Sequence, residues 1–83
     1  MKTISDFLES DVQTPLTQRK YLGYANNVLS GHHDELELTG NAFNVKFSLK
    51  GVSIENLWED ESEPLWISLD EFIQILSNWR TPH

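Results

Sequence analysis

The sequence has no cysteine, and its 83 residues include only six lysines and arginines against thirteen aspartates and glutamates. The absence of cysteine excludes disulfides, thiolate metal sites and a thiol nucleophile. The formal charge of -7 at pH 7 repels phosphate backbones and attracts basic surfaces. We therefore expect no nucleic-acid binding, and a partner, if there is one, that is a basic protein.

Long hydrophobic runs are also missing. The opening MKTISDFLESD lacks the apolar stretch of about 7 to 15 residues that a signal peptide needs, and no uncharged run approaches the ~20 residues of a membrane span. We expect a cytoplasmic protein without membrane contact. The hydrophobic fraction of 39 %, with three Trp, two Tyr and four Phe, is typical of a packed globule, so residues 1–83 are expected to form one domain.

Two helices are expected in the first part of the chain. A short one over residues 4–9 would bury its apolar side chains. A second has Thr14 as a plausible N-cap, Pro15 at its first helical position and Gly31 as its stop.

A third helix, over residues 69 to about 80, has the clearest start. Ser68 and Glu71 form the S-x-x-E capping box, in which each side chain satisfies a backbone N–H at the helix start. Apolar residues then recur at helical spacing, which predicts one buried face: Leu69, Phe72, Ile73, Leu76 and Trp79.

From residue 34 the apolar residues alternate with polar ones, which predicts antiparallel strands with one wet face. The apolar set is Leu36, Leu38, Phe43, Val45, Phe47, Leu49, Val52 and Ile54. Hairpin loops at Gly40-Asn41 and Lys50-Gly51 would pair Leu38 with Phe43 and Phe47 with Ile54. The same registers place Glu35, Lys46 and Glu55 in one row across the exposed face.

The expected fold class is therefore α+β, with a three-stranded antiparallel meander packed against an N-terminal and a C-terminal helix. Residues 64–67 (PLWI) are an optional fourth strand, which Pro64 confines to a sheet edge.

An acidic run between two tryptophans, NLWEDESEPLWI, has two interpretations: a solvated loop, or a surface that steers and anchors a basic partner. The strand register places Trp58 opposite Phe43 in the core and leaves Trp66 more open. The candidate partner-binding residues are Glu55, Glu59, Asp60, Glu61, Glu63 and Trp66.

His32, His33 and Asp34 raise the alternative of a metal site or a small enzyme. Adjacent side chains point apart, and no further His or Cys stands at a ligand-like spacing, so a polar loop is the preferred interpretation. No G-x-S-x-G elbow or glycine-rich phosphate loop is present. We expect no catalytic residues, no metal and no cofactor.

The meander ELELTGNAFNVKFSLKGVSIENLWED and the ending ISLDEFIQILSNW, together about residues 34–79, resemble small bacterial immunity proteins of contact-dependent growth inhibition and related polymorphic toxin systems. The resemblance implies a cytoplasmic protein that binds the toxin domain of a sibling effector, commonly a nuclease, and blocks it. It assigns no binding residue. The remaining alternative is a small acidic interaction or regulatory domain with no toxin partner.

Overall fold

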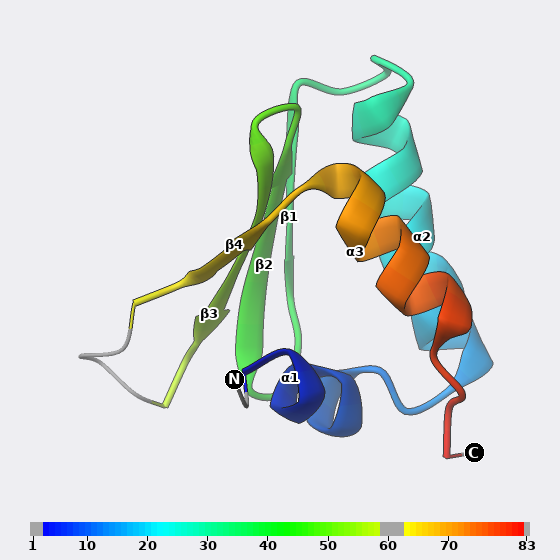
Figure 1. Ribbon diagram of the computed structural model, residues 1–83, viewed down its shortest axis with the longest axis vertical. Coiled ribbons are helices and arrows are strands. Elements are labelled where there is room, and N and C mark those ends of the chain that lie inside the picture. The colour runs from blue at the N-terminus through cyan, green and yellow to red at the C-terminus, as the bar shows by residue number, and fades with distance from the viewer. Residues whose placement is uncertain (1–2, 59–62, 83) are drawn as a thin grey trace.

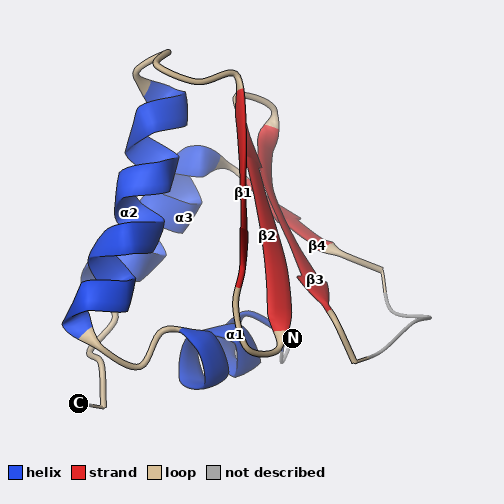
Figure 2. Cartoon of the chain, turned by 180° about the vertical axis from the view of Figure 1, so that it is seen from behind, coloured by secondary structure: helices blue, strands red, loops and turns tan. Residues whose placement is uncertain are grey.

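The computed structural model describes residues 3–58 and 63–82 and confirms an α+β fold (Figure 1). In chain order, its elements are α1 (Thr3–Asp11), α2 (Pro15–Leu29), β1 (Glu35–Thr39), β2 (Phe43–Ser48), β3 (Gly51–Asn56), β4 (Leu65–Ile67) and α3 (Leu69–Asn78). The strands form one antiparallel sheet in the order β1-β2-β3-β4, so the short fourth strand is present and lies at an edge. Figure 2 shows that α2 and α3 cover one face of the sheet and that α1 lies across its end.

The helix starts follow the capping residues. Thr14 Oγ1 accepts a hydrogen bond from Thr17 N at 3.2 Å, and Ser68 Oγ accepts one from Glu71 N at 3.0 Å. Two bounds differ from the prediction: α1 covers Thr3–Asp11 rather than 4–9, and α3 ends at Asn78 rather than near 80.

An aromatic cluster joins the helices to the sheet. Phe7 of α1 meets Tyr21 of α2 edge to face with ring centroids 5.2 Å apart, and Phe47 of β2 meets Phe72 of α3 in the same way at 5.3 Å. These are favoured geometries for aromatic rings, and all four side chains are buried. One apolar core therefore includes every helix.

Both hairpin registers differ from the predicted ones. Leu38 pairs with Val45 rather than Phe43, and Phe47 pairs with Val52 rather than Ile54. The second turn is Leu49-Lys50 rather than Lys50-Gly51, because Ser48 pairs with Gly51. A primed turn needs positive φ at both central residues or at the first. Within the described chain only glycines adopt positive φ, so the Leu49-Lys50 turn is not a primed turn.

Each register shift is an even number of residues, so most side chains stay on the expected face. Leu49 is the exception: it lies in the turn with 68 % of its surface exposed, not in the core. The predicted row of Glu35, Lys46 and Glu55 is also wrong, since Lys46 stands opposite Glu37 on one side and Ser53 on the other.

A buried carboxylate fixes α1 to the first hairpin. Asp11, at the end of α1, accepts hydrogen bonds from the backbone N–H groups of Ala42 and Phe43, both at 3.0 Å. A Cβ on Gly40 would collide with this carboxylate and lie 2.9 Å from the Tyr21 hydroxyl, so the loop needs glycine here. Burial, and then the charge of Asp11, raise the pKa of Tyr21 far above its usual value, so Tyr21 stays protonated.

A second set of polar contacts fixes the end of α3. The Trp79 indole Nε1 donates to the Val12 carbonyl at 2.7 Å. Gln18 Nε2 of α2 donates to the carbonyls of Leu76 at 2.5 Å and Trp79 at 2.8 Å, at the end of α3 where backbone carbonyls run short of helical partners. The Leu76 carbonyl also accepts from Trp79 N at 3.3 Å. The ends of α1 and α3 therefore meet the start of α2.

Candidate protein-binding face

The sheet face opposite the helices is not covered by any described element (Figure 2). Because side chains alternate along a strand, the polar members of the meander collect on this open face. We use "open face" for the following residues on it: Glu35, Glu37, Asn44, Lys46, Ser53, Glu55 and Trp66.

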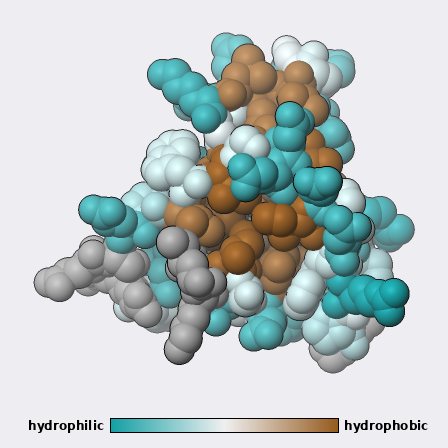
Figure 3. Space-filling model, in the orientation of Figure 1, coloured by the Kyte–Doolittle hydropathy of each residue, from teal (hydrophilic) through white to brown (hydrophobic). Residues whose placement is uncertain are grey.

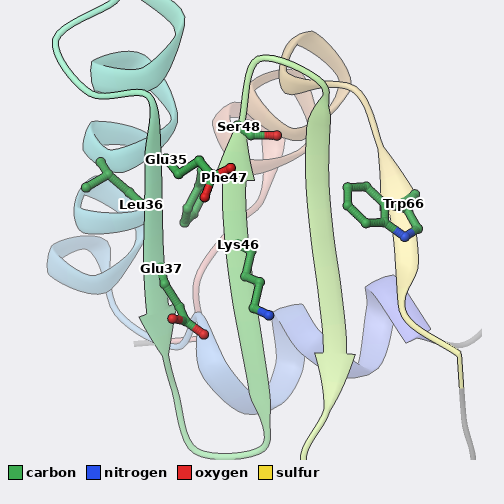
Figure 4. Close-up of a pocket in the computed structure, with 7 residues that line it drawn as sticks. All are labelled: Glu35, Leu36, Glu37, Lys46, Phe47, Ser48 and Trp66. Carbon is green, nitrogen blue, oxygen red and sulfur yellow. The ribbon is translucent and has the colours of Figure 1, made fainter.

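Two shallow depressions lie on the open face and share Lys46 and Trp66. One, of about 420 Å³, is lined by Glu35, Leu36, Glu37, Lys46, Phe47, Ser48 and Trp66 (Figure 4). The other, of about 270 Å³, is lined by Asn44, Lys46, Ser53, Glu55, Pro64 and Trp66. The face thus places Lys46 of β2 between carboxylates from β1 and β3, with the ring of Trp66 on the edge strand β4.

Trp66 supplies the exposed aromatic ring of this face. It pairs with Ser53 across the edge of the sheet, and 61 % of its surface is exposed, as expected from the sequence. A Cβ on Gly51 would lie 3.7 Å from Trp66 Cε3, so the indole lies close to a backbone that has no side chain.

The carboxylate of Glu37 is held in place by its neighbours. Asn44 Nδ2 donates to Glu37 Oε2 at 2.6 Å, and Thr39 Oγ1 donates to Asn44 Oδ1 at 2.7 Å. Only 8 % of the Asn44 surface is exposed. Glu37 can therefore meet a partner with part of its orientation already fixed, which lowers the entropic cost of binding.

The predicted partner-binding residues fall into two groups. Glu55 and Trp66 line the same depression, and Glu63 is exposed next to Pro64, which also lines it. Glu59, Asp60 and Glu61 lie outside the described residues. The prediction did not include Glu35 and Glu37 among the binding residues, although their alternation with Leu36 and Leu38 placed them on the same face as Glu55.

The predicted burial of Trp58 is wrong, because 78 % of its surface is exposed. Phe43 pairs with Asn56, at the end of β3, so Trp58 lies beyond the paired residues. The Asn56 side chain accepts a hydrogen bond from Trp58 N at 2.8 Å, which turns the chain there.

Hydrophobic side chains also reach the surface on the side of the molecule that carries α3 and β4 (Figure 3). Leu65, Ile67 and Ile73 are half-buried against the core in this region. These residues complete the core at its margin, whereas the open face is formed mainly by polar residues.

The histidine pair does not form a metal site with other described residues. His32 and His33 are exposed after the end of α2, and His32 Nδ1 lies 2.6 Å from Ser30 Oγ. In residues 3–58 and 63–82, no three His, Asp or Glu side chains are grouped so that they could hold a metal ion. None of the helices in these ranges has the length and apolar character needed to cross a membrane.

No protein-family model matches the chain, and no significant match was found among the curated proteins or the solved structures. The chemistry of the chain's own surface is therefore what bears on its function. The open face combines carboxylates, a lysine and an exposed aromatic ring on one surface.

Proposed function

We propose that the protein is an immunity protein that binds one basic toxin domain, a nuclease, and neutralises it as a stoichiometric inhibitor. The observation that carries the proposal is the open face, where Glu35, Glu37, Lys46 and the exposed Trp66 line one depression and Glu55 lines a second one with Lys46 and Trp66. The resemblance of residues 34–79 to small immunity proteins supports the same function.

Charge and aromatic contact have separate roles in this proposal. The net charge of -7 attracts a basic domain and speeds its association. Trp66 then supplies contact area, since exposed tryptophans are frequent energetic centres of interfaces. Against a nuclease, the carboxylates would occupy positions that substrate phosphates otherwise take.

The size of the protein is compatible with a tight complex. A standard interface buries about 800 Å² on each partner. The accessible surface of the chain is 5496 Å², so one face can supply that area.

Lys46 gives the open face a means of discrimination. It lies in both depressions, on β2 between the carboxylates of β1 and Trp66 of β4. A partner with only positive charges would be repelled at Lys46, whereas a matched partner presents an acidic or neutral group there. Mismatched charges of this kind are one means by which interfaces exclude wrong partners.

The proposal also covers the cellular location, the oligomeric state and the absence of catalytic activity. The inhibitor acts in the cytoplasm as a monomer, without a cofactor and without catalysis of its own. It binds neither nucleic acid nor membranes.

The test uses the C-terminal domain of the protein encoded immediately upstream as the candidate toxin. Wild-type protein should co-purify with that domain and abolish its nuclease activity at equimolar amounts. Changing Glu35→Gln, Glu37→Gln and Glu55→Gln together should slow association by about tenfold at low salt and flatten its salt dependence.

A matched control removes the same number of charges from exposed helix positions: Asp6→Asn, Glu9→Gln and Asp70→Asn. This control should slow association much less, because its carboxylates lie on the helices. Absence of a complex with the upstream domain contradicts the immunity function, and equal slowing in both variants contradicts the role of the open face.

The alternative is a small acidic interaction or regulatory domain with no toxin partner, whose charge serves only solubility. A gene position unrelated to any secreted effector, together with a partner that has no toxic activity, favours this alternative.

A further inference from the structure

Among the strands of residues 3–58 and 63–82, none runs along the outer edge of β1. β1 is the first strand in the order β1-β2-β3-β4, and it pairs only with β2 among the described strands. Figure 2 shows β1 at the rim of the sheet, with the helices on one side of it. An edge strand of this kind is a template on which another strand can be added.

The hydrogen-bonding phase of the hairpin identifies the outward groups. Gly40 N donates to Phe43 O at 2.9 Å while Phe43 N donates to Asp11, so Gly40 and Phe43 occupy a hydrogen-bonded position of the ladder with one of its two bonds made. In an antiparallel ladder such pairs alternate with non-bonded ones, so Leu36 and Leu38 direct their N–H and C=O groups toward β2. Glu35, Glu37 and Thr39 therefore direct theirs away from the sheet.

The side chains along this edge differ between the two faces. Leu36 and Leu38 are half-buried toward α2, and they remain partly exposed because no strand of the described chain lies outside β1. Glu35 and Glu37 are exposed on the open face. An added strand would fit best with apolar residues toward α2 and basic residues beside the glutamates.

A second copy of this chain does not meet that requirement. If two β1 edges paired antiparallel and centred on Glu37, the two Glu37 side chains would face each other. Like charges directly opposite in a sheet are destabilising. The glutamates thus disfavour self-pairing and favour a basic strand.

We infer that β1 accepts an extended basic segment of the partner protein as a fifth strand of the sheet, with its lysines or arginines beside Glu35 and Glu37. This inference rests on the proposed function for the biological partner, and it adds the mode of binding. The added strand would continue the open face beyond β1, separated from Lys46 by β1 and at the opposite edge of the sheet from Trp66.

A short synthetic peptide of alternating valine and lysine is the probe. When it binds, amide exchange measured by NMR should slow by about tenfold at Glu35, Glu37 and Thr39, because these N–H groups gain acceptors. Exchange at Leu36 and Leu38, whose N–H groups already bond to β2, should change less. A peptide with glutamate in place of lysine should not bind.

A pair of variants separates the backbone contribution from charge. Glu37→Pro and Glu37→Gln both remove the carboxylate, but only Glu37→Pro also removes the outward N–H. The Glu37→Pro protein should therefore bind the peptide about five- to tenfold more weakly than the Glu37→Gln protein. If Glu37→Pro perturbs the fold in NMR spectra, Glu35→Pro and Glu35→Gln replace the pair, because proline is tolerated at the first residue of a strand.

The outcomes distinguish this inference from the proposed function. No peptide binding, binding without protection of the three amides, or equal affinity of the proline and glutamine variants overturns the added strand. If the upstream toxin domain still binds through the open-face carboxylates, the proposed function stands alone. If the peptide protects the three amides but the upstream toxin domain does not bind, strand addition at β1 is supported and the immunity function is contradicted.

Discussion

The two faces of the sheet are built from alternate residues of the same strands, yet they have opposite properties. On the covered face Val45, Phe47 and Val52 are almost completely buried. Between them on the open face stand Lys46, which is exposed, and Ser53, which lines a depression with only 6 % of its own surface exposed. Stability and binding are thus assigned to interleaved positions, which lets one face change while the other is kept.

The largest expected effect comes from the covered face. Phe72→Ala removes a ring that contacts Phe7, Tyr21 and Phe47 in the core, and it should lower the free energy of unfolding by about 3 to 5 kcal/mol. Urea denaturation measures the loss, and Phe72→Leu should lose less because it fills more of the cavity. A loss below about 1 kcal/mol would mean that this core is not closely packed.

A smaller effect is expected at the anchor between α1 and the first hairpin. Asp11→Ala leaves the N–H groups of Ala42 and Phe43 without their acceptor, and each unsatisfied buried group costs about 1 to 3 kcal/mol. We expect a loss of about 2 to 4 kcal/mol in urea denaturation. Asp11→Asn, which keeps one oxygen acceptor, should lose less, and equal losses would show that the hydrogen bonds are not what matters.

The smallest effect on stability is expected on the open face. Trp66→Ala should change the free energy of unfolding by no more than about 1 kcal/mol, since most of the ring is exposed. Binding to the toxin domain, measured by calorimetry, should weaken by about 2 kcal/mol or more if the ring is an anchor. The comparison of the two faces fails if Trp66→Ala unfolds the protein or leaves binding unchanged.

The helices and the faces of the strands were predictable because their causes are local. Thr14 and Ser68 cap helices through hydrogen bonds to residues three positions later. The strand faces follow from alternation alone, which is why they withstood an error in the register. Glu55 and Trp66 could be placed near one surface for the same reason.

The registers and the position of Trp58 were not predictable from local pattern, because tertiary contacts decide them. Asp11, far away in the sequence, binds the N–H groups of Ala42 and Phe43 and so stabilises the observed hairpin loop. Trp58 is apolar and was expected to pair, but β3 ends at Asn56. No residue type near Trp58 predicts the end of β3, because the length of β3 depends on how far its partner strand β2 extends.

The contacts at the end of α3 bear on how the protein comes apart. Trp79 is bonded to Val12, and Gln18 bridges to Leu76 and Trp79, so residues from opposite ends of the described chain share one junction. Loosening α3 would free both the α1–α2 connection and the first turn of α2. The protein should therefore unfold cooperatively, without an intermediate in which one helix is detached while the rest of the fold remains.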